Sequence, residues 1–347
     1  MKIKLIGFSS AGCSLVNKIS EGLSSKGNEC EAYGKCTFVS ECSVIPVTQT
    51  LHAWTEVAFQ DSDAIIFVGA VGIAVRAVAP FVKTKVADPA IVVLDERGSY
   101  SIPLLSGHIG GANTLAKIIA EMIGAEAVIT TATDINGKFS VDSFAEERGM
   151  YISSMACAKD ISAYILEKGN VGFKSDFPVY GQLMNGLVSA DDGDIGIHIT
   201  SNDAKGPFCK TLNLIPKTII IGLGCRKDTP AENIEKLVIK VLKSNELSIH
   251  SVKSAASIDL KMNEPGILNF CKKYGLEPEF FSKEELECVE GDFSESPFVK
   301  SITGVGNVCE RAALKASADG KLIQKKVAEN GVTVALVSEP YIVHLDK

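Results

Sequence analysis

The sequence lacks the patterns that identify several common classes of protein. Its most apolar window, residues 64–82, is interrupted by two glycines, an arginine and a proline, so it is too broken to span a bilayer. The first residues lack the apolar core and cleavage site of a signal peptide. No Walker A sequence occurs, and the pair Gly222 and Gly224 lacks the third glycine of a dinucleotide fingerprint. We therefore expect a cytoplasmic protein that does not bind membranes, and a nucleotide site has little support.

Metal and redox cysteine motifs are also missing. The chain has ten cysteines but no Cys-x-x-Cys pair, so their spacing carries no zinc or redox signature. The even spacing of Cys30, Cys36 and Cys42 leaves metal binding open, although packed free thiols are the commoner use of such residues. We therefore expect no resident metal.

Basic residues are fewer than acidic ones. Lysine and arginine total 35 against 42 aspartates and glutamates, which gives a formal net charge of −7. A nucleic-acid surface needs a clustered basic face, so a small-molecule ligand is the better expectation. Arginine is scarce, and Arg76, Arg97, Arg226 and Arg311 stand beside glycines or acids at the ends of predicted elements. These positions suit an anionic ligand because arginine pairs bidentately with carboxylates, although surface ion pairs are the alternative for each.

The length and the pattern of apolar residues predict an α/β protein with more than one domain. At 347 residues the chain exceeds the roughly 250–300 residues at which single cores stop growing. Short β-branched runs at 2–8, 64–70, 90–98 and 126–134 alternate with helical periods, as at 11–25 and 112–123. We predict an N-terminal domain with an open, mostly parallel sheet over residues 1–135, a smaller central α/β region over 136–216, and a separate α/β domain over 217–347.

Polar or glycine-rich turns follow the consecutive predicted strands of the first domain. Ligands bind at the carboxyl ends of strands in open parallel sheets. We therefore expect Arg76, Asp95, Glu96, Asp134 and the turn that holds His108 to line one edge of one crevice.

The richest group of candidate site residues lies in LLSGHIGGANTLAKIIAEMIG, residues 104–124. Hydrogen-bond donors and glycines gather there at Ser106, Gly107, His108, Gly110, Gly111 and Asn113. A carboxylate beside an imidazole builds a general base, so Asp95 or Glu96 is a candidate partner for His108. A lone histidine is more often structural, and that alternative stays open. Ser106 lacks the Gly-x-Ser-x-Gly elbow of a hydrolase nucleophile.

The segment that begins at residue 217 offers a second group of candidates. Thr229, Pro230 and Glu232 predict a capping box that starts a helix, and Ser282 with Glu285 predicts another. Glycines and free amides at helix starts can hold an anion, although tight structural turns are about as common. The candidates in this segment are Gly222, Gly224, Arg226, Glu264, Glu310 and Arg311.

Long strings of the sequence resemble a known family. VGAVGIAVRAVAPFV, VVLDERGSYSIPLLSGHIGGANTLAKIIAE and AVITTATD are similar to the N-terminal domain of the CbiG family of anaerobic cobalamin biosynthesis. GLGCRKDTP, SIDLKMNEPGI and TGVGNVCERAAL resemble that family's C-terminal domain, which it shares with the CobE proteins. The resemblance covers nearly the whole chain, and IPLLSGHIGGAN is its most specific part.

The resemblance implies an enzyme that opens the δ-lactone of cobalt-precorrin-5A and releases acetaldehyde. Our hypothesis for the mechanism, which the family pattern does not fix, makes His108 the general base, oriented by Asp95 or Glu96. Substrate binding would fall to Arg76, Ser106, Gly107, Gly110, Gly111, Asn113, Thr131, Asp134, Gly222, Gly224, Arg226, Glu264, Glu310 and Arg311. Cobalt would arrive inside the substrate, so no cofactor is expected.

Two other functions remain open at this point. One is a non-catalytic carrier of corrinoid intermediates, and the other is a nucleotide-dependent α/β enzyme that NAD or ATP would stabilise. The sequence also leaves open the oligomeric state, a homodimer included, and transient contacts with the methyltransferases of the pathway.

Overall fold

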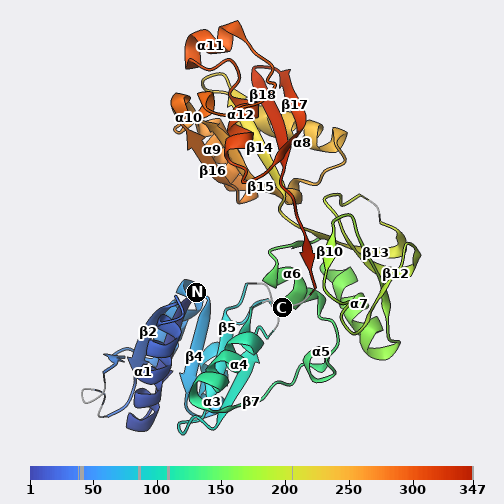
Figure 1. Cartoon of the computed structure of the whole chain (residues 1–347). Coiled ribbons are helices and arrows are strands. Elements are labelled where there is room, and N and C mark those ends of the chain that lie inside the picture. Colours follow the sequence, from blue (N-terminus) through green and yellow to red (C-terminus); the bar gives the residue numbers. More distant parts are fainter. Residues whose placement is uncertain (38, 40–42, 85–86, 108–109, 205, 346–347) are drawn as a thin grey trace. The chain divides into compact units, whose positions relative to one another are not determined.

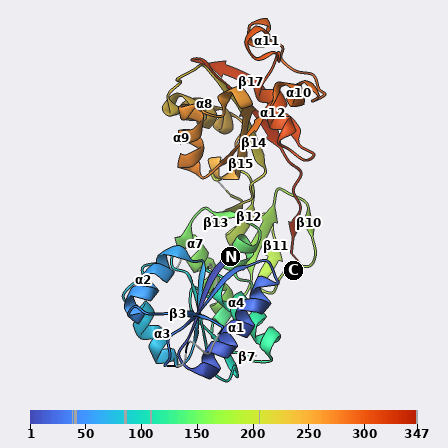
Figure 2. The same ribbon diagram turned by 90° about the vertical axis from the view of Figure 1, so that its left-hand side faces the viewer.

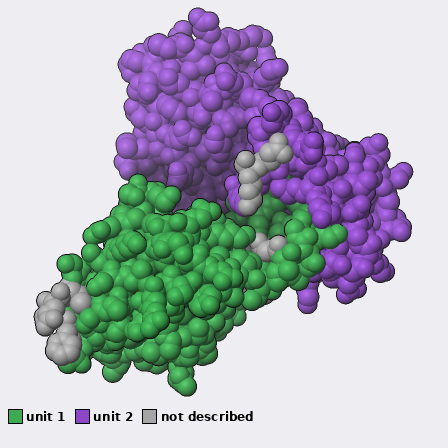
Figure 3. Space-filling model, turned by 60° about the horizontal axis from the view of Figure 1, so that its bottom comes forward, with its two compact units in different colours: residues 1–146 green, residues 147–347 purple. Residues whose placement is uncertain are grey.

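The computed structural model describes residues 1–37, 39, 43–84, 87–107, 110–204 and 206–345, with the backbone alone at 133, 134 and 298. It divides into two compact units, residues 1–146 and 147–347 (Figure 3). No helix in these ranges is long and apolar enough to cross a membrane. Both units combine β-sheets with packed helices, and this α/β architecture confirms the predicted fold class. The three-part domain division stays a prediction.

Unit 1 contains a seven-stranded sheet in the order β3-β2-β1-β4-β5-β6-β7. Its strands are β1 (Lys2–Gly7), β2 (Glu29–Gly34), β3 (Ile45–Pro46), β4 (Ala64–Val68), β5 (Ala90–Leu94), β6 (Tyr100–Leu105) and β7 (Glu126–Ala127). Its helices are α1 (Ser10–Ser24), α2 (Leu51–Asp61), α3 (Val71–Val78), α4 (Ala112–Ile123), α5 (Ala132–Ile135) and α6 (Val141–Glu147). Helices α1 and α4 cover one face of the sheet, and α2 and α3 cover the other (Figure 2).

The direction of β6 differs from what the sequence predicts. Strands β1 to β5 are mutually parallel, but β6 runs antiparallel to β5, and Leu105 pairs with Ile91 at the start of β5. The turn after β6 therefore lies at the opposite sheet edge from the turns after β4 and β5. The expectation that these turns line one edge is wrong. The connection from Leu94 to Tyr100 is too short for the crossover that a parallel pair requires.

The predicted strand over residues 126–134 is also shorter than expected. Only Glu126–Ala127 form β7, which runs parallel to β6, and the segment ends in the short helix α5. Strand β7 is an edge strand of the sheet.

Unit 2 contains two five-stranded sheets, of which the first has the order β11-β9-β12-β13-β8. Its strands are β8 (Tyr151–Ile152), β9 (Val171–Ser175), β11 (Leu187–Ser189), β12 (Gly193–Ile199) and β13 (Phe208–Ile215), with α7 (Met155–Glu167) between β8 and β9. Strand β19 (Val343–His344) pairs with β10 (Val179–Tyr180), so the end of the chain returns to this region (Figure 1).

The second sheet of unit 2 has the order β16-β15-β14-β18-β17. Its strands are β14 (Ile219–Cys225), β15 (Val252–Ile258), β16 (Glu277–Phe281), β17 (Lys321–Glu329) and β18 (Val332–Ser338). Helices α8 (Ala231–Ser244) and α9 (Pro265–Tyr274) cover one face, and α10 (Lys283–Glu287), α11 (Pro297–Thr303) and α12 (Cys309–Lys315) lie on the other (Figure 2). Two 3₁₀ segments, η2 (Ile249–Ser251) and η3 (Asp259–Lys261), flank β15.

The two predicted capping boxes have different outcomes. Ser282 and Glu285 form the box at the start of α10 as predicted. The box at Thr229 is wrong, because Pro230 is the N-cap of α8 and makes no side-chain cap. The Thr229 hydroxyl instead donates to the carbonyl oxygen of Arg226 at 2.7 Å and closes the turn before the helix.

The close approach of α12 to β14 gives a stability prediction. A Cβ at Gly222 would lie 1.8 Å from the carbonyl oxygen of Cys309. We expect Gly222→Ala to lower the free energy of unfolding by about 3 kcal/mol, the upper end for overpacking, in urea denaturation followed by circular dichroism. At Gly72 in α3 the added methyl would meet only the flexible end of Arg76. Gly72→Ala should therefore keep or slightly raise stability, and equal effects of the two changes would contradict the close packing of α12.

Candidate functional site

The turn between β6 and α4 is the most elaborate of the predicted site segments. Ser106 has a left-handed backbone, with φ of 57°, and its hydroxyl donates to the carbonyl oxygen of Asp88 at 3.0 Å. The amides of Ala112 and Asn113 donate to the carbonyl oxygens of Ser106 and Gly107, each at 3.0 Å. These bonds close the turn on itself. His108 lies outside the described residues, so its predicted role as base stays a prediction.

The glycines of this turn are required by close contacts. A Cβ at Gly107 would lie 2.8 Å from Oδ1 of Asn113, and one at Gly110 would lie 2.3 Å from Cβ of Ser106. Gly111 has φ of 76° and is the N-cap of α4. Any side chain at the first two positions would push the turn open.

Asn113 connects this turn to the residues before α5. Its side chain is 5% exposed, and its Nδ2 donates to Oγ1 of Thr131 at 2.8 Å. The chain after β7 continues beside β6, where the amide of Val128 donates to the carbonyl oxygen of Ser101. The segment after β7, which includes Thr131, therefore meets the turn after β6.

We call the residues gathered there the β6 cluster, which consists of Ser106, Gly107, Gly110, Gly111, Asn113 and Thr131. Asp134 follows in α5, and its side chain is outside the described atoms.

Asp95 closes the hairpin between β5 and β6 at the opposite edge of the sheet. Its carboxylate accepts hydrogen bonds from the amides of Arg97, Ser99 and Tyr100 at 3.2, 2.7 and 2.8 Å. Burial raises the pKa of Asp95, but the three amide hydrogen bonds outweigh burial and hold the pKa below its usual value. The ionised Asp95 carboxylate is thus occupied by hydrogen bonds from the amides of its own turn.

Glu96 lies at the same edge as Asp95. Its Oε2 accepts a hydrogen bond from the hydroxyl of Ser9, the N-cap of α1, at 2.8 Å. The five residues of β5 span about 16 Å, so neither carboxylate is within hydrogen-bonding distance of the β6 cluster. Arg76 is exposed on α3 and donates to the carbonyl oxygen of Gly72 at 3.0 Å. The structure therefore does not bring Arg76, Asp95 or Glu96 to the β6 cluster.

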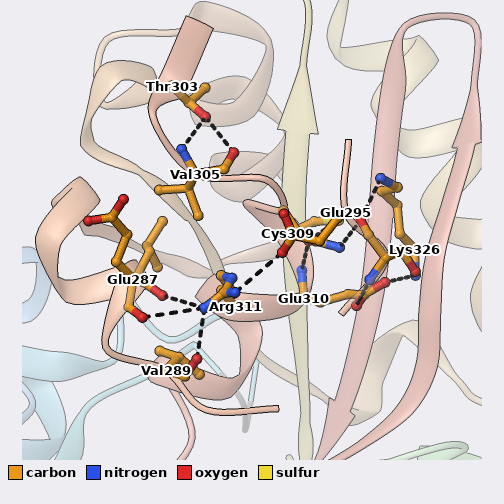
Figure 4. A network of polar contacts seen from close by, with 12 residues as sticks. Glu287, Val289, Glu295, Thr303, Val305, Cys309, Glu310, Arg311 and Lys326 are labelled. Atoms are coloured by element: carbon orange, nitrogen blue, oxygen red, sulfur yellow. Dashed lines mark hydrogen bonds and ion pairs between the residues drawn. The ribbon is translucent and has the colours of Figure 1, made fainter. Parts of the chain in front are cut away.

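Glu310 and Arg311 hold an irregular segment in unit 2 (Figure 4). The fully buried Glu310 carboxylate accepts hydrogen bonds from the amides of Lys326 and Ser294 at 2.7 and 3.2 Å. The Arg311 guanidinium donates to the carbonyl oxygens of Leu286 and Val289 at 3.2 and 2.8 Å. It also lies 4.3 Å from the centroid of the Phe293 ring and pairs with Glu295. The charged groups of Glu310 and Arg311 are therefore engaged by partners within unit 2.

The remaining candidates of unit 2 are divided between packing and an exposed turn. Gly222 and Gly224 lie within β14, and a Cβ at Gly224 would lie 2.5 Å from Oγ1 of Thr333. Glu264 is 6% exposed and accepts hydrogen bonds from the amide of Asp228 and from Lys261. Arg226 is exposed at the end of β14. Only Arg226 among these four presents a charged group to solvent.

Two polar contacts were missed by the sequence analysis. The Asp88 carboxylate accepts two bonds from the amide of Lys83, at 3.0 and 2.9 Å, while its carbonyl accepts from Ser106. The signal was the Asp-Pro pair at residues 88–89, which favours a turn. In β12, Nε2 of His198 lies 2.8 Å from Oδ1 of Asp176, a pairing that no local motif indicates. Across the described ranges, no three His, Cys, Asp or Glu side chains are placed to hold a metal ion.

Family models match three consecutive parts of the chain. They describe the Cobalamin synthesis G N-terminal region at residues 53–134, the Cobalamin biosynthesis central region at 139–216, and the Cobalamin synthesis G C-terminus at 219–337.

Curated relatives match across both units. The chain is 36% identical over 291 residues to the cobalt-precorrin-5A hydrolase of Salmonella typhimurium, covering 80% of this chain and 83% of the relative. It is 32% identical over 303 residues to the cobalt-precorrin-5A hydrolase of Priestia megaterium, covering 82% and 80%. Protein CobE of a Sinorhizobium species is 30% identical over 120 residues, covering 34% of this chain and 78% of that protein.

The contacts of Asp95 predict a pH-dependent contribution to stability. Its folded pKa lies below the usual value of 3.8, so its contribution is present at neutral pH and is lost as pH falls through the lowered value. We expect Asp95→Asn to reduce the free energy of unfolding by about 1 kcal/mol at pH 7, in urea denaturation at a series of pH values.

The difference between Asp95→Asn and the parent protein should shrink as pH falls below 4. The exposed Glu56 serves as the control, and Glu56→Gln should change little at any pH. A deficit in Asp95→Asn that stays constant down to the lowest pH would contradict the role given to its charge.

Proposed function

The chain belongs to the CbiG family of cobalamin-synthesis proteins, and on this premise we propose that it is a cobalt-precorrin-5A hydrolase. The observation that carries the proposal is the 36% identity to the Salmonella typhimurium enzyme of that name, which extends over 80% of the chain. The alignment is not confined to one region, because the family models match parts of both units.

The proposed reaction uses water and breaks a carbon–carbon bond. Water adds to the lactone carbonyl, and the ring C–O bond breaks to give a carboxylic acid and a hydroxyl group. Loss of the hydroxyl proton forms the carbonyl of acetaldehyde as the adjacent carbon–carbon bond breaks. The electron pair of that bond passes into the conjugated macrocycle. Cobalt is part of the substrate, so we propose no resident cofactor.

We assign the lactone step to the β6 cluster and to His108 in the same turn. An imidazole can take a proton from the attacking water at neutral pH. Backbone amides near Gly110 and Gly111 are suitable donors to the oxyanion that develops on the lactone carbonyl. Asn113, whose Nδ2 is bonded to Thr131, holds the turn in place. Asp95 and Glu96, which follow the carboxyl end of β5, would have to act from the other sheet edge.

Other parts of the proposal concern location and partners. We propose that the protein acts in the cytoplasm on a polycarboxylate corrinoid, with transient contacts to the methyltransferases of the pathway. Homodimer formation stays a prediction.

Anaerobic incubation with cobalt-precorrin-5A tests the function. We expect the protein to release acetaldehyde, measured with alcohol dehydrogenase and NADH, and to change the mass of the corrinoid. His108→Asn should slow the release by roughly 10²- to 10⁴-fold, the usual contribution of a general base. The control is His52→Asn, because His52 is an exposed histidine in α2 of the same unit.

Three outcomes decide between the alternatives. Tight corrinoid binding without acetaldehyde or a mass change would overturn the hydrolase and favour a carrier. Nearly normal release by His108→Asn would remove this histidine from the mechanism. A loss in Asp95→Asn equal to that in His108→Asn would show that the carboxylate acts in the same step despite its place at the other edge.

A further inference from the structure

The turn after β14 is held by several specific contacts. The amide of Asp228 donates to Oε1 of Glu264 at 2.7 Å, and the Thr229 hydroxyl donates to the carbonyl oxygen of Arg226 at 2.7 Å. Asp228 has a left-handed backbone with φ of 58°. A Cβ at Gly266 would lie 2.1 Å from the carbonyl oxygen of Thr229, so the turn rests directly on the start of α9.

Glu264 is the residue on which this turn depends. A buried carboxylate is costly unless hydrogen bonds and an opposite charge compensate it. Here one oxygen accepts from the turn and the other pairs with Lys261 at 2.9 Å. Left-handed backbone outside glycine persists only where its surroundings hold it, and such positions gather at functional sites.

The turn presents two cationic side chains to solvent. Arg226 and Lys227 are both exposed, and neither makes a side-chain hydrogen bond or ion pair within the described ranges. The stem of Arg226 lies against Gly331, where a Cβ would be 2.9 Å from Cδ of the arginine. The neighbouring carboxylates of Asp228 and Asp259 are also exposed, so acidic side chains stand next to the two cations.

Exposed apolar side chains lie beside this turn. Leu260 is 66% exposed, and no described large apolar side chain is more exposed, while Met262 is 54% exposed. Strand β14 pairs in parallel with β15, with Gly222 opposite Ala256, so Arg226 and Leu260 follow the two strands at the same level. Glu264 joins the turn to Lys261, so the segment that carries Leu260 and Met262 neighbours the turn at the carboxyl edge of the sheet, where such sheets bind ligands.

We propose that Arg226, Lys227, Leu260 and Met262 form a binding surface for one face of a macrocyclic polycarboxylate. The apolar side chains lie against the ring, and the two cations pair with carboxylates on its rim. Glu264 is a positioning residue that holds the turn rather than a ligand. The choice of occupant rests on the proposed function, whereas the surface itself rests on these contacts. A flat ring with anionic side chains matches both halves of the surface, which a simple anion or an apolar ligand does not.

Binding measurements on the full chain test the surface apart from catalysis. The probe is cobyrinic acid, a stable cobalt corrinoid with free carboxylates, and the comparison ligand is cobinamide, whose side chains are amides. We expect Arg226→Ala to weaken cobyrinic acid binding roughly tenfold and to reduce the preference for it over cobinamide. Met262→Glu, which places a negative charge against the ring and its rim carboxylates, should weaken both ligands.

Matched controls separate binding from general damage. Lys243→Ala removes an exposed charge from α8, and Ile323→Glu changes an apolar side chain on β17 that is 43% exposed. Both should bind like the parent protein. Glu264→Ala should weaken binding, whereas Glu264→Gln should restore most of it, because the glutamine oxygen can still accept from Asp228.

The outcomes are distinguishable from those of the hydrolase test. Unchanged affinity and selectivity in Arg226→Ala, together with unchanged affinity in Met262→Glu, would overturn the surface. Failure of the parent protein to bind cobyrinic acid would overturn it as well. Selective loss of binding in a protein that releases no acetaldehyde from cobalt-precorrin-5A would retain the surface and reject the hydrolase.

Discussion

The hydrogen bonds of Asp95 determine where the polar groups of unit 1 can meet. One carboxylate accepts three backbone amides and closes the connection between β5 and β6. A connection this short reverses the chain, so β6 runs antiparallel to β5 and ends beside its start. The β6 cluster is thereby placed at one edge of the sheet, and Asp95 and Glu96 at the other. The sequence suggests Asp95 as a catalytic partner of His108. In the structure Asp95 closes the β5–β6 connection, and this connection separates Asp95 from the β6 cluster.

The sequence predicts the elements of the fold better than their directions. Periodicity places β1, β4, β5, α1 and α4 close to their observed bounds because buried faces repeat at fixed intervals along each element. The antiparallel direction of β6 could also have been predicted from the sequence, because the short connection from Leu94 to Tyr100 cannot contain a crossover helix. The contacts of Glu310 and Arg311 could not be predicted, because their partners lie 16 to 25 residues away along the chain, in α10, in β17 and in the segment between α10 and α11. Local motifs carry no information about such contacts.

Two arginines in unit 2 show why residue type alone does not identify a binding group. Arg226 and Arg311 both stand at the ends of predicted elements and both suit a carboxylate. Arg311 is surrounded by carbonyl oxygens and an aromatic ring, so its charge stabilises the fold. Arg226 is exposed on a turn that a buried carboxylate holds. Burial and partners, which only the structure supplies, separate the structural arginine from the candidate ligand.

The net negative charge of the chain limits how a site can bind an anionic macrocycle. With a formal net charge of −7, the long-range field of the protein opposes the approach of a polycarboxylate. Affinity must then come from short-range contacts, where a guanidinium meets a carboxylate and apolar side chains cover the ring. Such contacts need cations that are not already used in ion pairs within the protein. A turn held by Glu264 meets this requirement, because the carboxylate that orients the turn pairs with Lys261 and leaves Arg226 unpaired within the described ranges.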